Sequence, residues 1–288
     1  MKFWRLALTL AIGLAADVSG QQSTRSLAET SVVLNFYGLK EKEVLQKALS
    51  SLAPLVRSND VFVFVSGNRL GEPDIALVAS WAEKAHQLFP QVGIWALTSG
   101  LANVKLLAEA RDKIPACVTT IIYDYEPNWD NEPEFAPDFD KTVSNFIHAA
   151  EIARAGKFAF GGAPTGRPLL RNEFASYTWD YGKLAKASEA DVMIIQTQTY
   201  CKKGITDFRS ALAKLKAQQL GAGLSLDKAC PQVTVDLSAP NGTTPAHAAA
   251  CIGEARREGF SRISLWFAPA RVENAVDLLT LLGRGAPR

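Results

Sequence analysis

The sequence predicts a single (β/α)8 barrel, and three observations support this prediction. The chain has 288 residues, 48% of them hydrophobic, which suits one globular domain of generous size. Short apolar, β-rich runs alternate with amphipathic helical patterns, and the runs begin every roughly 26 to 41 residues, the length of a strand, a helix and two loops. Eight such units in about 250 residues match a closed parallel barrel. A doubly wound open sheet fits less well, because no GxGxxG motif follows the first run.

Eight segments have the composition of buried parallel strands. They are apolar and rich in β-branched and aromatic residues, and they end in glycine, proline or polar residues. The predicted strands lie within 31–38, 60–67, 92–100, 118–127, 157–166, 191–200, 221–227 and 262–269.

Between these segments, apolar residues recur at helical spacing, which predicts amphipathic helices that cover the outside of the barrel. The fifth pattern, around Leu184, is the least regular. The other patterns lie at 41–56, 75–88, 101–114, 139–155, 208–219, 246–258 and 272–282.

The first 20 residues resemble a secretory signal peptide, and we place a short linker at 21–30 and the barrel at 31–288. Lys2 and Arg5 precede an apolar stretch over 6–16, and small residues follow at 18–20. The apolar stretch is shorter than the ~20 residues that cross a bilayer. We therefore expect a secreted protein, or a periplasmic one in a bacterium, without membrane association once the signal is removed. An uncleaved anchor is the alternative.

Charge and sequence motifs exclude several function classes. The 31 basic and 29 acidic residues are interspersed, without a basic stripe, so no nucleic-acid partner is expected. Neither GxSxG nor a Ser-His-Asp order is present. We expect no cofactor, and we expect the chain to act as a monomer.

Four cysteines, Cys117, Cys201, Cys230 and Cys251, form no CxxC motif and have no histidine at ligand spacing, so we expect no metal site. In an exported protein they predict disulfides, and three full pairings are open. Asn241 begins a glycosylation sequon, which matters only in a eukaryotic host.

In this architecture, active sites lie at the carboxyl ends of the strands. Polar and aromatic residues concentrate at the predicted strand ends, after apolar stems. The candidates are Asn35, Tyr37, Ser66, Trp95, Thr98, Asp124, Glu126, Gly161, Gly162, Pro164, Gln196, Gln198, Tyr200, Ser225, Asp227 and Trp266.

The fourth strand ends in the sequence IIYDYEP, at 121–127. Strand alternation directs Asp124 and Glu126 into the barrel mouth, and Tyr123 and Tyr125 toward the helices. Two carboxylates in one small space of low dielectric do not both ionise freely, so one should hold a proton near neutrality. Such a group is a candidate general acid for a glycosidic oxygen. We assign this role to Glu126, with Asp124 as its partner; a structural pair bonded to loop amides or an arginine is the alternative.

Most glycosidases need a second catalytic carboxylate on another strand. Barrel glycosidases whose fourth strand ends in Asn-Glu-Pro carry a second glutamate at the end of strand seven. At that place this chain has only Asp227.

The chain resembles glycoside hydrolase family 18, the chitinases and endo-N-acetylglucosaminidases, which use one catalytic glutamate. Asp124-Tyr125-Glu126 matches the last D-x-E of that family's D-x-x-D-x-D-x-E, and Gln198-Thr199-Tyr200 matches its Q-x-Y on strand six. Trp266 and Ala163-Pro164 are similar to residues of strands eight and five. The chain departs from the pattern at Thr119 and Ile122, where the family has aspartates, and 92–100 lacks S-x-G-G.

The resemblance implies a role for each matched residue. Glu126 would protonate the leaving oxygen, and Asp124 would orient the substrate's acetamido group, which acts as the nucleophile. The hydroxyl of Tyr200 would hold the acetamido oxygen, and Trp266 would form the floor of the sugar site.

Further candidates for substrate contacts are glutamines and aromatic residues. Each has a structural alternative: internal hydrogen bonds for the glutamines, the barrel core for the tryptophans, a loop cap for Asp227, and packing under their own loops for Trp129 and Trp179. The candidate substrate-binding residues are Gln198, Trp266, Tyr37, Gln196, Trp95, Asp227 and Trp129.

The leading hypothesis is a secreted glycosidase that cleaves β-linked N-acetylglucosamine-containing glycans by substrate-assisted retention. Two alternatives stay open. The first is a catalytically inactive, chitinase-like carbohydrate-binding protein, which Ile122 suggests. The second is a barrel glycosidase of another family that uses Asp227 or a loop acid as its second carboxylate.

Overall fold

A computed structural model describes residues 27–37, 41–66, 71–127, 133–171, 175–239 and 241–285. The predicted signal peptide and Trp129 lie outside the described residues. Within this part of the chain, no helix combines the length and apolar character that crossing a membrane requires.

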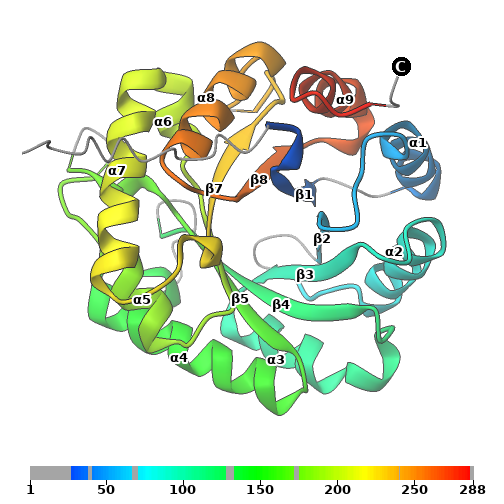
Figure 1. Cartoon of the computed structure of the whole chain (residues 1–288). Helices are drawn as coiled ribbons and strands as arrows, with labels where there is room; N and C mark the ends of the chain where they lie inside the picture. Colours follow the sequence, from blue (N-terminus) through cyan, green and yellow to red (C-terminus); the bar gives the residue numbers. More distant parts are fainter. Residues whose placement is uncertain are drawn as a thin grey trace, which may run out of the picture.

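Eight parallel strands form a closed barrel in which each strand pairs with the next and the eighth pairs with the first (Figure 1). This arrangement confirms the predicted (β/α)8 barrel. The strands are β1 (Ser31–Phe36), β2 (Val61–Val65), β3 (Gly93–Ser99), β4 (Val118–Tyr125), β5 (Ala159–Pro164), β6 (Val192–Ile195), β7 (Ala229–Thr234) and β8 (Arg262–Phe267).

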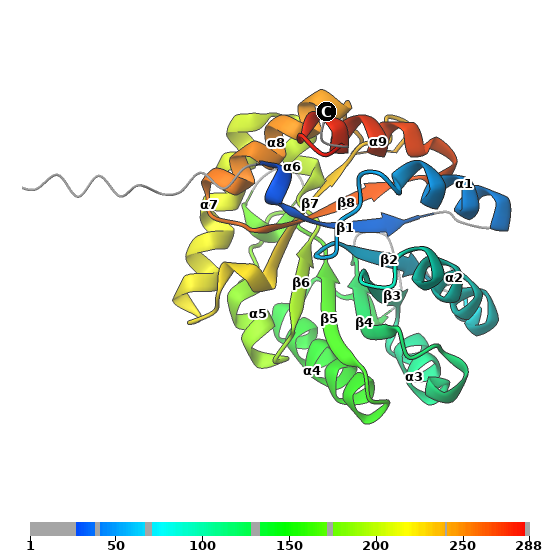
Figure 2. The same cartoon turned by 45° about the vertical axis from the view of Figure 1, so that its right-hand side comes forward.

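Helices form an outer ring around the barrel (Figure 2). Four begin at a side-chain cap: the side chains of Asp74, Asp138, Asp180 and Thr244 each accept a hydrogen bond from the backbone N–H three residues on. The helices are α1 (Lys42–Leu52), α2 (Ile75–Leu88), α3 (Leu101–Glu109), α4 (Phe139–Ala155), α5 (Tyr181–Ala187), α6 (Gln198–Lys203), α7 (Ile205–Gly221), α8 (Pro245–Arg257) and α9 (Val272–Leu281).

The predicted position of strand seven, 221–227, is wrong. α7 continues to Gly221, a left-handed Gly223 (φ 75°) turns the chain, and a 3-10 turn occupies Leu226–Lys228. The strand itself is Ala229–Thr234, which contains Pro231. Proline is disfavoured inside strands, so residues 229–234 have only a weak strand pattern. The alternating residues Leu224–Asp227 have a strand pattern although they form no strand.

The predicted end of strand six is also wrong, because β6 ends at Ile195 and Gln198 begins α6. The backbone N–H of Thr197 donates to the Ile195 carbonyl at 2.7 Å, a tight turn that takes the chain out of the sheet. The Thr197 hydroxyl then donates to Gln232 O at 3.0 Å and accepts from Gln232 N at 3.1 Å. A side chain thus replaces strand pairing at this level of the barrel.

The hydrophobic core has two shells, because alternate residues of each strand face opposite sides. The outer shell packs the strands against the helices. The inner shell fills the barrel and includes Val33, Val63, Trp95, Leu97, Ile122, Ala163, Ile194 and Cys230. Burial raises the pKa of the Cys230 thiol to about 12, so this cysteine stays protonated.

A fully buried ion pair lies at the amino-terminal end of the barrel. The Arg284 guanidinium donates to both carboxylate oxygens of Asp60, at 2.6 and 2.9 Å, and also to the Thr30 carbonyl. Asp60 further accepts from the backbone N–H groups of Val32 and Arg57, each at 2.8 Å. Both side chains are 0% exposed.

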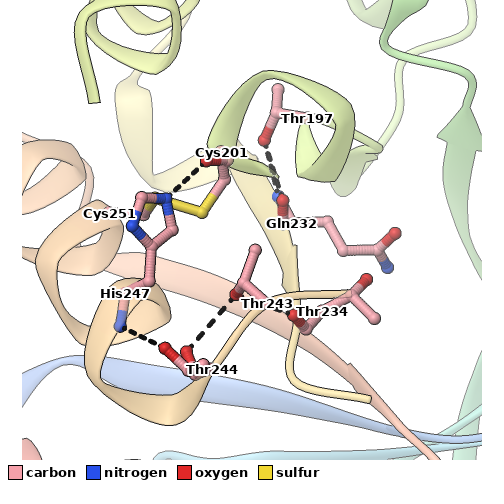
Figure 3. Close-up of a disulfide and its surroundings, with 8 residues drawn as sticks. All are labelled: Thr197, Cys201, Gln232, Thr234, Thr243, Thr244, His247 and Cys251. Atoms are coloured by element: carbon pink, nitrogen blue, oxygen red, sulfur yellow. Dashed lines mark hydrogen bonds between the residues drawn. A yellow bond between two sulfur atoms is a disulfide. The ribbon is translucent and has the colours of Figure 1, made fainter. Parts of the chain in front are cut away.

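One disulfide, Cys201–Cys251, joins α6 to α8 (Figure 3). Cys117 and Cys230 are free thiols, so the structure contains one bridge and none of the three full pairings. His247 lies beside the bridge, with Nε2 2.6 Å from the Cys201 carbonyl oxygen (Figure 3). The potential ligand atoms of Cys201, His247 and Cys251 lie within 4.8 Å of one another, but the bridge occupies both sulfurs.

Candidate active site

The end of β4 places an acid inside the barrel mouth. The Asp124 carboxylate accepts a hydrogen bond from Gln196 Nε2 at 2.9 Å and a longer one from the Ser99 hydroxyl at 3.5 Å. Ile122, two residues earlier, belongs to the inner shell, which confirms the predicted inward face. Glu126 follows the last residue of β4, and both acids are half-buried.

The two tyrosines of this segment face the helices, as predicted. Their hydroxyls converge on Glu134: Tyr123 donates to Glu134 Oε1 at 2.5 Å, and Tyr125 donates to the Glu134 carbonyl at 2.8 Å. Glu134 Oε1 also accepts from Leu101 N, at the start of α3, at 2.8 Å. Burial is the largest cause that raises the pKa of Tyr123 and of Tyr125, so both hydroxyls remain donors. Sequence analysis missed Glu134, because the short 3-10 turn that contains it, Pro133–Phe135, gives no strand or helix pattern.

Gln196, the residue directly after β6, reaches the mouth. It forms an isolated parallel bridge with Thr165, and its Nε2 donates to Ala163 O at 2.9 Å as well as to Asp124. Gln198 begins α6, and its Oε1 is buried without a hydrogen-bond partner among the described residues.

Tyr200 lies inside α6, and not at the end of a strand as predicted. Its side chain is 2% exposed. Its hydroxyl donates to Arg167 O at 2.8 Å and accepts from Leu170 N at 3.1 Å. The structure therefore brings this hydroxyl to the loop that follows β5.

An aromatic pair lies at the carboxyl ends of β1 and β8. The rings of Tyr37 and Trp266 stack with centroids 5.2 Å apart and an interplanar angle of 24°. Tyr37 is 39% exposed, and Trp266 is half-buried. The structure thus brings two of the predicted sugar-contacting residues together.

Two other predicted aromatic contacts lie elsewhere. Trp95 was expected at the end of strand three, but it lies in the inner shell near the start of that strand, with the Arg262 guanidinium 5.9 Å from its ring centroid. Trp179 is 2% exposed and donates from its indole nitrogen to Pro137 O at 3.1 Å, so it is buried against the loop that follows β4.

Asp227 is not at the carboxyl end of strand seven. It precedes β7, at the opposite end of the barrel, and its carboxylate accepts hydrogen bonds from the hydroxyls of Ser261 and Ser225. The prediction failed because the strand was placed one segment too early.

The acid that follows β7 is Asp236, which sequence analysis missed for the same reason. It accepts from Ser238 N at 3.0 Å, from the Ser238 hydroxyl at 2.6 Å and from Arg271 Nη1 at 2.8 Å. Burial alone would raise the pKa of Asp236, but the Ser238 hydrogen bonds and the Arg271 charge outweigh it, so this pKa lies below its ordinary value.

A polar row crosses the interior from β7 to β1. Asn35 Nδ2 donates to the Ser264 hydroxyl at 2.7 Å, and Gln232 Nε2 donates to the same oxygen at 3.0 Å. Asn35 Oδ1 is buried without a hydrogen-bond partner among the described residues. Gln232 was missed because it lies in the strand that sequence analysis misplaced.

At its carboxyl end the barrel therefore combines half-buried carboxylates, amides, hydroxyls and a stacked aromatic pair. Aromatic faces pack on the apolar faces of ligands, and amides and hydroxyls hydrogen-bond to polar groups. A carboxyl group in such a place can transfer a proton to a bound molecule. The arrangement suits a ligand that has both hydroxyl groups and flat apolar faces.

Comparison with known proteins finds likeness at the level of structure. No family model matches the sequence, and no curated protein matches it. A chitinase from Chromobacterium violaceum superposes with a TM-score of 0.59 at 12% identity, over 90% of this chain and 100% of that one. A fungal endo-β-N-acetylglucosaminidase of glycosyl hydrolase family 18 gives 0.56 at 11% identity, over 88% and 97%.

A family 18 chitinase from Cycas revoluta, solved in complex with (GlcNAc)4, gives a TM-score of 0.53 at 10% identity, over 88% of this chain and 98% of that one. At these identities the likeness shows the fold. The expected resemblance of this chain to family 18 barrels is confirmed at that level.

Proposed function

We propose that the chain is a divergent family 18-like glycoside hydrolase that cleaves β-linked N-acetylglucosamine-containing glycans with Glu126 as its general acid. One observation carries the proposal: Asp124 faces the barrel mouth near the end of β4, and Glu126 is the first residue after that strand. The likeness to chitinase and endo-β-N-acetylglucosaminidase structures supports the same reaction class.

The proposed reaction proceeds in two steps with retention of configuration. Glu126 protonates the leaving glycosidic oxygen while the substrate's acetamido oxygen attacks the anomeric carbon and closes a five-membered ring. Glu126, now ionised, then takes a proton from water while the water oxygen attacks the anomeric carbon, which breaks the bond from this carbon to the acetamido oxygen and opens the ring. The Asp124 carboxylate accepts from the acetamido N–H and thereby favours its attack, and Tyr37 and Trp266 provide an aromatic surface for a sugar ring.

Ile122 favours a second candidate function, a carbohydrate-binding protein without turnover. Its side chain packs in the inner shell against Gly161, where an added Cβ would lie 2.4 Å from Ile122 Cδ1. This layer of the barrel is therefore filled by apolar atoms beneath Asp124.

The alternative with two carboxylates loses its main residue, because Asp227 lies at the other end of the barrel. A loop acid could still be the second catalytic carboxylate. If that enzyme inverts, its first product has the opposite anomeric configuration to the substrate, and proton NMR detects this difference.

The central experiment replaces Glu126 by Gln and measures hydrolysis of chitin oligomers and N-glycans. We expect kcat to fall about 10²- to 10⁴-fold, the usual contribution of general acid–base catalysis. Glu109→Gln, at the far end of α3 on a side chain that is 62% exposed, is the matched control and should leave kcat unchanged.

Unchanged hydrolysis by the Glu126→Gln variant would disprove the proposed role of this residue. Binding to a glycan array without hydrolysis by the native chain would support the second candidate. The absence of both binding and hydrolysis would reject both functions.

We also propose that residues 1–20 direct export. The charged and apolar pattern of this segment and the Cys201–Cys251 bridge, which persists in oxidising compartments, support this proposal. N-terminal sequencing of the mature protein should find a start near residue 21. Retention of Met1 in protein purified from its native host would contradict export by cleavage.

A further inference from the structure

We propose that Gln196 is the positioning residue of this site: its amide sets the orientation of Asp124 before any substrate binds. The inference rests on the proposed function, and it changes the role that sequence analysis gave to Gln196, a direct contact with the substrate. Gln196 and Asp124 are 72 residues apart in sequence and meet across the barrel interior.

The direction of the hydrogen bond is fixed by a second acceptor. Gln196 Nε2 lies 2.9 Å from Asp124 Oδ1 and 2.9 Å from the Ala163 carbonyl oxygen. A carbonyl can only accept, so the amide nitrogen must face both groups. Gln196 therefore donates to Asp124, and this contact fixes which way the carboxyl group is turned.

The backbone that carries Gln196 is held from both sides. Its bridge to Thr165 connects it to the end of β5, and the reciprocal hydrogen bonds of Thr197 with Gln232 connect the next residue to β7. Gly166 packs so closely that a Cβ there would lie 2.4 Å from Gln196 O. With an exposed fraction of 8%, the side chain has little room for another rotamer.

Two side chains from elsewhere in the barrel donate to Asp124. Ile122, the preceding inward residue of β4, is apolar and offers no hydrogen bond. The Ser99 hydroxyl on β3 lies at 3.5 Å, at the limit of a hydrogen bond, whereas Gln196 lies at 2.9 Å. Gln196 is thus the shorter of these two contacts and the one held by a rigid backbone.

The test uses Gln196→Met in the full chain, which keeps the length of the side chain and removes the donor. We expect kcat to fall about 10- to 100-fold, the loss for one hydrogen bond to a charged group, while KM stays within about threefold. Gln87→Met, on the exposed side of α2, is the matched control and should leave both constants unchanged.

A second readout does not depend on turnover. In native protein labelled with ¹³C at aspartate carboxyls, the Asp124 resonance should be single and sharp, and it should shift or broaden in Gln196→Met. Gly166→Ala is a second variant, for use if Gln196→Met fails to fold. It keeps the Gln196 side chain but displaces its backbone, so it should change the same resonance and lower kcat.

The outcomes separate this inference from the proposed function. A rise in KM with kcat intact would mean that Gln196 contacts the substrate directly and would overturn the positioning role, as would an unshifted Asp124 resonance. If the native chain hydrolyses no glycan, the proposed function fails, and the resonance alone then decides whether Gln196 holds Asp124.

Discussion

The two ends of the barrel each contain an aspartate held by hydrogen bonds across strands, and the two are held differently. At the amino-terminal end, Asp60 is fully buried and its charge is matched by the Arg284 guanidinium. At the carboxyl end, Asp124 is half-buried, and the contacts described for it come from a neutral amide and a hydroxyl. One acid is enclosed by charge and backbone, whereas the other keeps an accessible side.

The difference shows how this architecture separates stability from chemistry. A buried aspartate with a bidentate arginine is costly to disturb but cannot reach a ligand. A half-buried aspartate at the mouth, which accepts from an amide and a hydroxyl, can still accept another hydrogen bond. Changes at the first end should therefore alter folding, and changes at the second should alter binding and rate.

The largest effect on folding is expected from Arg284→Met. The substitution leaves the Asp60 carboxylate buried without a counter-charge, which should lower the free energy of unfolding by about 3–5 kcal/mol. Urea denaturation measures this loss. The double variant Asp60→Asn/Arg284→Met should recover part of it. A loss below about 1 kcal/mol for the single variant would contradict the contrast between the two ends.

The next effect concerns the Cys201–Cys251 bridge, which spans 50 residues and joins α6 to α8. α6 begins two residues after the mouth residue Gln196. Replacing both cysteines by serine should lower the free energy of unfolding by up to about 4 kcal/mol, mainly because the unfolded chain gains freedom. Cys117→Ser is the control, since that thiol is free. If the serine variant folds as stably as the native chain, the bridge does not stabilise this side of the barrel.

A smaller effect should appear only in binding. Trp266→Ala removes one ring of the stacked pair, so KM for chitin oligomers should rise about tenfold, equivalent to about 1.4 kcal/mol, with a small change in melting temperature. Tyr37→Ala should act in the same direction. A large loss of stability with unchanged KM would mean that the stacked pair stabilises the barrel and does not contact the substrate.

The smallest expected effect is the pH dependence that Asp236 adds at the mouth. Its pKa in the folded chain lies below the ordinary value of 3.8. Its stabilising contribution is therefore complete above that value and is lost as the pH falls through the lower, folded-state pKa. The contribution is small, because the partner Arg271 is 50% exposed.

Melting temperatures of Asp236→Asn and of native protein should thus differ most above pH 4 and converge below it. Glu254, whose pKa is lowered to about 2 by hydrogen bonds from Arg209 and Arg257, titrates in the same acidic range in both proteins. The difference between the two curves isolates Asp236. A constant difference down to pH 2 would contradict the assigned shift.

Most of the fold could be predicted from the sequence because its signals are local. Alternation in 121–127 correctly separated Asp124 from Tyr123 and Tyr125, and the 139–155 pattern coincides with α4. The predicted position of strand seven was wrong because Pro231 weakens the local signal of a strand. The hydrogen bonds that form this strand come from neighbours far away in sequence.

The site was harder to predict, because its contacts join residues from different strands. The Q-x-Y match at 198–200 lies in α6, and the amide that reaches Asp124 is Gln196, two residues earlier. No local pattern shows that the chain turns at Thr197, since that turn depends on Gln232 from the next strand. Asp236 was not predicted for a related reason: its place at the mouth depends on where β7 ends, and strand seven was misplaced.

The partners of the Asp60–Arg284 pair are 224 residues apart in sequence. At the usual rate of protein synthesis, roughly 11 to 45 s separate the two codons on the ribosome. During that interval the nascent chain has a carboxylate that awaits its arginine and a first strand whose edge has no β8 to cover it. An open edge of this kind can pair with other chains, so the time needed to translate the second half of the barrel sets how long the growing protein is exposed to aggregation.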